Sequence, residues 1–184
     1  MDMDGRLAAI EARLEIAQLP VRYALGVDSR DVELIVGTFH PEAWMGKRWG
    51  LGPDAARAFY NDVLKRFYRS VHHLGGHLVE LIDPDNATGK VYCRAEHEDR
   101  GKWIVQSIIY SDEYRRAPDG RWCFLRRRHL HWYSTDILER PAADFQSWPG
   151  WENDPPALPH AFPSWTEYWG RVPPEEIAEL TSSP

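Results

Sequence analysis

Apolar side chains near the start of the chain recur at intervals of three and four residues, the period of an amphipathic helix. This spacing predicts a helix over residues 4–19 with one apolar stripe, formed by Leu7, Ile10, Leu14 and Ala17. Pro20 cannot donate a backbone hydrogen bond, so we expect it to kink the chain or to open a second helix that ends near Asp28. The apolar face of that second helix would carry Val21, Ala24 and Leu25.

Two further helices are predicted before the sheet. Asp31 can cap a helix over residues 32–39, which stops before Pro41. Residues 43–49 are a weak strand candidate. A turn rich in glycine then leads into a helix over 54–68 with a broad apolar face.

From position 71 onward the pattern changes to the alternation of β-strands. Segments rich in Asp, Pro, Asn and Gly divide it into four strands, at 71–82, 88–98, 103–115 and 121–133. Such long strands must twist, and Gly75-Gly76 favours a bulge. The prediction is an α+β fold: helices packed on a long curved antiparallel sheet, with room for a cone-like cavity between the layers.

The composition narrows the function classes. The length of 184 residues favours one domain with one core. The net charge of -6, with no long basic run, gives no sign of a surface that binds nucleic acid. Its start shows no signal peptide and no membrane span, so we expect a cytoplasmic protein. Cys93 and Cys123 read as buried reduced thiols. Nine Trp and eight Tyr suit a pocket for a flat apolar ligand, or equally well subunit contacts.

The last part of the chain differs from the rest. Nine of the fourteen prolines lie from Pro141 onward, together with six Trp, Phe and Tyr side chains between 148 and 169. We therefore divide the chain into a cone-shaped domain, 1–134, and an extended arm, 135–184, packed on the body or on a neighbouring subunit. A short helix is possible over 174–180.

The candidate chemistry centres on the stretch 71–77, which holds His72, His73 and His77. Strand parity leaves open which of them faces inward, because a bulge at the two glycines would change the alternation. On the next strand, alternation places His97 on the same inward face as Val91, Cys93 and Ala95. A structural histidine is the plainer interpretation of each one.

Asp28 and Tyr23 are the candidates on the helices. Asp31 is better placed to cap the following helix, which leaves Asp28 available for another role. In a regular helix Tyr23 and Asp28 point about 140° apart, and a core tyrosine is an equal alternative. His129 and His131 share a strand face, and two such imidazoles could be ligands of a zinc or iron site. No carboxylate at a familiar ligand spacing completes the ligand set, so we predict no metal site. P-loop, G-x-S-x-G and G-x-G-x-x-G motifs are absent from the sequence.

The motifs 23–28, 71–77 and 87–92 with His97, then 112–116 and 119–122, in this order, resemble the SnoaL-like branch of the nuclear transport factor 2-like superfamily. Within it the chain is similar to the scytalone dehydratase, bile-acid dehydratase and hexachlorocyclohexane dehydrochlorinase group. The resemblance implies a cone-shaped fold and a cofactor-free lyase, commonly a trimer, with an Asp-His pair in an apolar cavity.

By position, the resemblance implies that Asp28 and His72 form the Asp-His dyad of the family. It also implies that His97 matches a second histidine present in scytalone dehydratase and that Tyr23 matches a tyrosine of the bile-acid enzyme. His131 falls near where the bile-acid enzyme has an arginine. Val27 replaces the tyrosine that scytalone dehydratase has before its aspartate, which argues against the same substrate. Besides these catalytic candidates, the residues expected to contact substrate are His131, Trp44, Phe59 and Tyr110.

The resulting hypothesis is an elimination on an apolar, aromatic or polycyclic small molecule, with His72 as the base and no cofactor. An isomerase with Asp28 as a direct base and a non-catalytic binding module are the alternatives. As partners we expect a small apolar substrate and further copies of the chain, with a trimer favoured and a dimer possible. We expect neither nucleic acid nor a membrane.

Overall fold

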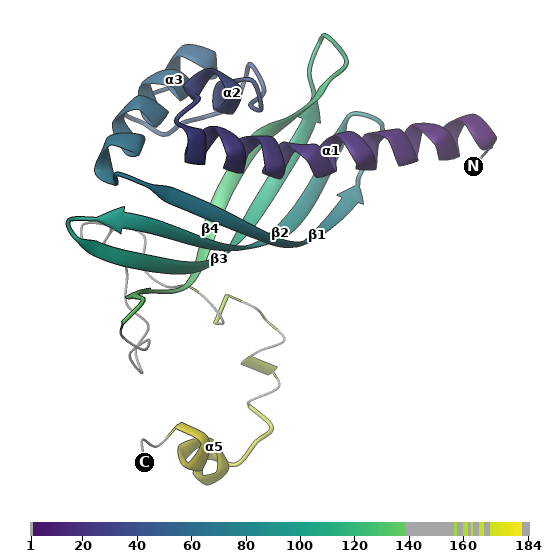
Figure 1. Ribbon diagram of the computed structural model, residues 1–184. Helices are drawn as coiled ribbons and strands as arrows, with labels where there is room; N and C mark the ends of the chain where they lie inside the picture. Colours follow the sequence, from purple (N-terminus) through teal and green to yellow (C-terminus); the bar gives the residue numbers. More distant parts are fainter. Residues whose placement is uncertain are drawn as a thin grey trace.

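The computed structural model describes residues 2–138, 157, 160–161, 163, 166–167 and 170–181. Helices cover one face of a four-stranded antiparallel sheet, which confirms the α+β prediction (Figure 1). The helical segments are α1 (Met3–Ser29), α2 (Val32–Val36), α3 (Gly52–Val63) and the 3-10 helix η1 (Leu64–Arg66). The strands are β1 (Ser70–Leu81), β2 (Asn86–Asp99), β3 (Lys102–Arg116) and β4 (Trp122–Asp136).

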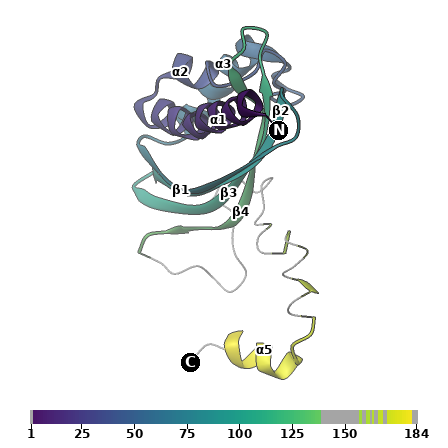
Figure 2. The same cartoon turned by 90° about the vertical axis from the view of Figure 1, so that its right-hand side faces the viewer.

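The sheet is a meander in the order β1-β2-β3-β4, and it curls around the helices (Figure 2). Three register shifts accompany the curl. One lies between Leu74 and His77, where the sequence predicted a bulge, and the other two lie along the β3–β4 pair. An extra residue reverses the alternation of a strand, so His72 and His77 both face the helices although five positions separate them.

Helix α1 is continuous from Met3 to Ser29, so the expectation that a second helix begins at Pro20 is wrong. Pro20 removes one backbone hydrogen bond, but it is fully buried, and packing of the turns on either side keeps the helix together. The buried face of α1 carries Ala12, Ile16, Leu19, Tyr23 and Val27. Of the apolar positions predicted from the sequence, Ala24 is buried as expected. The larger side chains of the predicted faces do not pack on the core: Leu7, Ile10, Leu14, Val21 and Leu25 are each more than half exposed.

Other boundaries also differ from the sequence prediction. Residues 43–49 form turns with only an isolated bridge between Trp44 and Leu51, because Gly46 and Gly50 take positive φ angles that interrupt an extended strand. Helix α2 ends at Val36, because the next residues bond to β4 through His40 N and Phe124 N. Asp31 caps α2 as predicted, accepting from Leu34 N at 2.9 Å.

Near the C-terminus the structure confirms a short helix, α5 (Pro174–Thr181). Strand β4 runs to Asp136, slightly past the predicted domain boundary. Most of the predicted arm, including 139–156, lies outside the described residues. Among the residues that are described, no helix combines the length and the apolarity needed to cross a membrane.

Candidate active site

The end of α1 and the start of β1 bring Asp28 against His72. His72 Nδ1 lies 2.7 Å from Asp28 Oδ1, and the His72 backbone N–H donates to Asp28 Oδ2 at 2.9 Å. The Ser70 hydroxyl donates to Oδ1 at 2.8 Å. Burial alone would raise the pKa of Asp28, but the bonds from His72 and Ser70 outweigh it and hold that pKa below its usual value. The carboxylate is therefore charged and fixes the imidazole.

Arg30 supports this pair from the residue after α1. It adopts a left-handed conformation, with φ of 63°, which is uncommon outside glycine. Its guanidinium donates to Ser70 Oγ at 3.0 Å and to the carbonyls of Phe67 and Tyr68. The same group lies 4.8 Å from the centre of the Phe67 ring. One side chain thus ties the end of α1 to the connection between η1 and β1.

His72 also lines a small internal cavity of about 40 Å³ between the helices and the sheet. The other lining residues are Tyr23, Val27, Tyr60, Val63, Leu64, Phe67, His97, Gln106, Ile108, Tyr110 and His129. Apolar and aromatic groups dominate this wall. Three of the four catalytic candidates, His72, His97 and Tyr23, therefore meet at one cavity, while Asp28 bonds to His72 and is not among the lining residues.

His97 stands nearly perpendicular to both of its ring neighbours. Its ring centre lies 5.6 Å from that of His72 and 4.5 Å from that of Phe67. Burial, followed by the charge of neighbouring His72, lowers the pKa of His97 to about 3. His97 is consequently neutral near pH 7, and it can offer one N–H and one lone pair but no positive charge.

Tyr23 lies among aromatic rings in the core, and Arg127 lies against it. Burial raises the pKa of Tyr23, while Arg127 and a hydrogen bond with Tyr60 act in the opposite direction. The Arg127 guanidinium carbon is 4.5 Å from the Tyr23 ring centre and 4.0 Å from that of Tyr110. Asp112 binds this guanidinium through two bonds, of 2.9 and 2.7 Å.

Sequence reasoning missed Arg127. Within the run Arg126-Arg127-Arg128 it reads as one of three surface cations, yet its side chain is 3% exposed. A β-bulge near Leu125 turns it inward, and its Nη1 has no hydrogen-bond partner among the described residues. Charged side chains are rarely buried in this way, so a guanidinium with one unpaired nitrogen, packed against Tyr23 and Tyr110 of the cavity wall, is a candidate functional group.

Comparison with known proteins identifies the family. Residues 8–128 match the model of the SnoaL-like domain. The chain belongs to the SnoaL-like family. An uncharacterized protein of Mycobacterium tuberculosis is 32% identical to this SnoaL-like chain over 128 residues, which cover 66% of the chain and 86% of that protein.

Solved structures agree on the fold of this SnoaL-like protein. The hexachlorocyclohexane dehydrochlorinase LinA-type3 from Novosphingobium barchaimii is 23% identical, with a TM-score of 0.65, over 73% of this chain and 96% of that one. A proposed scytalone dehydratase from Novosphingobium aromaticivorans is 20% identical, with a TM-score of 0.60, over 77% and 95%. The nuclear transport factor 2-like fold and the SnoaL-like membership predicted from the sequence are confirmed.

The expected substrate contacts of the SnoaL-like chain separate in space. Tyr110 lines the cavity, whereas Trp44, Phe59 and His131 are absent from its lining. Trp44 is 53% exposed. Phe59 packs edge-on against Tyr60. His131 is buried beside Gln106, with 3.1 Å between His131 Nε2 and Gln106 Nε2, and its neighbour on the same strand face, His129, reaches the cavity instead.

The remaining histidines of the 71–77 stretch lie apart from the dyad. His73 points outward and its side chain is 60% exposed. His77 faces inward farther along β1, where its Nε2 lies 3.0 Å from the Tyr114 hydroxyl, which in turn donates to Asp112. Among the residues with described positions, no three His, Cys, Asp or Glu side chains gather as a metal-binding group.

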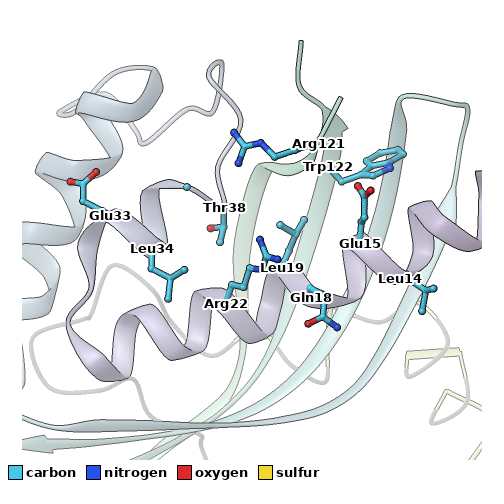
Figure 3. Close-up of a pocket in the computed structure, with 11 residues that line it drawn as sticks. Leu14, Glu15, Gln18, Leu19, Arg22, Glu33, Leu34, Thr38, Arg121 and Trp122 are labelled. Carbon is cyan, nitrogen blue, oxygen red and sulfur yellow. The ribbon is translucent and has the colours of Figure 1, made fainter. Parts of the chain in front are cut away.

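A larger hollow lies outside the helical layer. This groove of about 670 Å³ runs between α1, α2 and the start of β4, and its walls include Glu15, Arg22, Arg121 and Trp122 (Figure 3). None of its lining residues belongs to the dyad or to the internal cavity. The smaller internal cavity is therefore the one that His72, His97 and Tyr23 share.

Proposed function

We propose that this SnoaL-like protein is a cofactor-free lyase that eliminates water or another leaving group from an apolar, ring-containing small molecule. The observation that carries the proposal is the 2.7 Å contact between His72 Nδ1 and Asp28 Oδ1 at the wall of an apolar cavity. With Nδ1 engaged by a carboxylate, Nε2 is the nitrogen left to take a proton from substrate carbon.

The position of Asp28 favours His72 as the base over direct proton abstraction by the carboxylate. Both Asp28 oxygens accept bonds, from Ser70, the His72 ring and the His72 backbone. Asp28 is also absent from the cavity lining. A carboxylate base of the isomerase type would need a free oxygen facing the substrate, so the geometry supports a dyad.

The proposed reaction places the leaving group beside Tyr23 and His97, which line the same cavity as His72. His72 Nε2 takes the proton, the C–H electrons form the new double bond, and the bond to the leaving group breaks with its electron pair. Tyr23 and neutral His97 would stabilise the departing anion by hydrogen bonds, and the cation of Arg127 behind Tyr23 would favour negative charge there. The proton held by His72 returns to solvent or to the leaving group, which balances the step.

Entry of such a substrate requires movement of the wall. The cavity of about 40 Å³ is far below the size of a ligand pocket, roughly 300 Å³ or more. Leu64 and Phe67 separate it from an outer groove of about 1040 Å³ beside η1 and the β2–β3 turn. The outward displacement of these two side chains would open a route, and their apolar character suits an apolar substrate. The names of the two structural neighbours, a dehydrochlorinase and a proposed dehydratase, support elimination chemistry.

The test measures product release from two probes, hexachlorocyclohexane (chloride release) and fused-ring β-hydroxy ketones (enone absorbance). Asp28→Asn and His72→Gln should each lower turnover by roughly 100-fold or more, because the general base is lost or misaligned. His73→Gln, on the same strand but exposed, is the matched control and should retain activity.

Other outcomes separate the alternatives. Exchange of the ketone α-proton in D₂O without loss of the leaving group would indicate an isomerase. Binding of the probes without exchange or elimination would indicate a ligand-binding module. Wild-type turnover in both Asp28→Asn and His72→Gln would refute the dyad.

A further inference from the structure

The outer face of α1 carries an apolar stripe that nothing in the described chain covers. Six large apolar side chains there are between 51% and 72% exposed: Met3, Leu7, Ile10, Leu14, Val21 and Leu25. Single exposed apolar residues are ordinary, but a row along one helix marks an interaction surface. The first turns of α1 project beyond the sheet edge (Figure 1).

The spacing of the stripe is that of a coiled coil. Leu7, Leu14 and Val21 are seven apart and occupy position a of a heptad, while Met3, Ile10 and Ala17 occupy position d. The buried residues Ala12, Ile16, Leu19 and Tyr23 occupy positions f and c, on the opposite side of the helix. Helix α1 therefore has one face committed to its own core and a second face patterned for another helix.

Charged residues beside the seam indicate what that helix is. Position g holds Arg6 and Arg13, and position e holds Asp4 and Glu11. In a parallel pair, position g of one helix meets position e of the next heptad in its partner, which places Arg6 beside the partner's Glu11, twice by symmetry. An antiparallel pair centred on Leu14 would instead oppose Arg13 to the partner's Arg13 and give Glu11 no cation.

We propose that α1 pairs in parallel with α1 of a second copy of this chain, as a two-stranded coiled coil over about residues 3–21. Apolar contacts at positions a and d supply the attraction, and the pairs between Arg6 and the partner's Glu11 set the direction. The pairing does not depend on the proposed function, because Asp28 lies beyond the paired segment, near the C-terminal end of α1, and His72 lies on β1. A helix already folded on its own domain loses little entropy on pairing.

Light scattering and sedimentation of the full chain give the first test. The wild-type protein should have a mass that is an even multiple of the chain mass, and Leu14→Glu should halve it. Leu78→Glu, which alters a leucine of similar exposure on the outer face of β1, should leave the mass unchanged. A monomeric wild type, an odd-numbered assembly, or an assembly that survives Leu14→Glu with its helical circular dichroism intact would overturn the proposal.

Charge exchange then tests the direction. Arg6→Glu and Glu11→Arg should each weaken the pairing at low salt by about 2- to 10-fold, because each opposes like charges. An equimolar mixture of the two variants should pair as well as wild type, since each interface position again meets its opposite. A mixture that stays as weak as its components would refute the parallel pairing between Arg6 and the partner's Glu11.

Cross-linking supplies a check on register. Met3→Cys places a thiol at the first position d, where a parallel in-register pair brings two copies together. Mild oxidation should yield a disulfide-linked dimer rapidly, and Val21→Cys at the far end should do the same. Cross-linking only in a mixture of Met3→Cys with Val21→Cys would show antiparallel helices and overturn the proposal.

Discussion

Asp28 and His72 are joined at two points: Oδ1 to the ring nitrogen Nδ1 at 2.7 Å and Oδ2 to the backbone N–H at 2.9 Å. One carboxylate therefore fixes both the strand and the side chain that it carries. With Nδ1–H donating to the carboxylate, the tautomer leaves a lone pair on Nε2. This relationship makes the dyad depend on whatever holds Asp28 and β1 in place.

Arg30 is expected to be a positioning residue for the dyad. Arg30→Met should lower kcat by about 10-fold or more with a smaller effect on KM, because Ser70 and the Phe67 carbonyl lose their common anchor. Arg69→Met is the control, since Arg69 is an exposed cation that pairs with Glu98 and lies over the Tyr68 ring, with no described bond to the dyad or to Ser70. Steady-state kinetics with whichever probe substrate is turned over fastest measure both constants. An unchanged kcat for Arg30→Met would rule out the positioning role.

His97 should make stability depend on pH. The unfolded chain protonates this side chain near its usual pKa of 6.5, while the folded protein does so only at about 3. Stability should therefore fall as pH drops from 6.5 toward 3, by up to about 1.4 kcal/mol per pH unit. His97→Leu should flatten the slope in urea unfolding between about pH 6 and pH 4. His73→Gln should keep the wild-type slope, and an equal slope in His97→Leu would contradict the assignment.

The Asp112–Arg127 pair should be costly to break from one side. Its side chains are 0% and 3% exposed, so Asp112→Asn leaves an unpaired charge in the core and should destabilise the protein by about 3–5 kcal/mol. The double variant Asp112→Asn with Arg127→Met should cost less than the sum of the single changes, since no charge remains. Arg126→Met, in the exposed pair with Glu113, should cost about 1 kcal/mol or less by urea unfolding. Additive losses in the double variant would argue against coupling.

Two glycines of the sheet offer a matched comparison of packing. A Cβ at Gly89 would lie 2.8 Å from the Leu78 carbonyl oxygen and 2.9 Å from the Tyr114 ring, whereas a Cβ at Gly76 meets nothing within 4 Å. Gly89→Ala should destabilise the protein by about 1–3 kcal/mol, and Gly76→Ala should be near neutral. Thermal unfolding of both variants measures the difference in stability. Equal melting temperatures would show that the neighbours of Gly89 move to accommodate the added methyl group without loss of stability.

Local chemistry made much of the fold predictable. Strand alternation placed His97 with Val91, Cys93 and Ala95 on the buried face, and the Gly75-Gly76 bulge appears where it was expected. Residues with restricted or special backbone preferences marked the turns. Pro20 misled because its local penalty, about 3 kcal/mol, is offset by burial of the helix around it.

The sequence by itself determined the order of the elements, the inward face of β2 and, through family resemblance, Asp28 and His72 as partners. Only the tertiary structure decided that Arg127 is buried, that His129 rather than His131 lines the cavity, and that the first apolar stripe of α1 faces outward. A period identifies an apolar face but not what lies against it, since two faces of one helix satisfy the same spacing. A bulge reverses which face of the sheet each later residue of the strand points to. The strand register therefore decides which side chains are buried, and contacts between residues distant in sequence set that register.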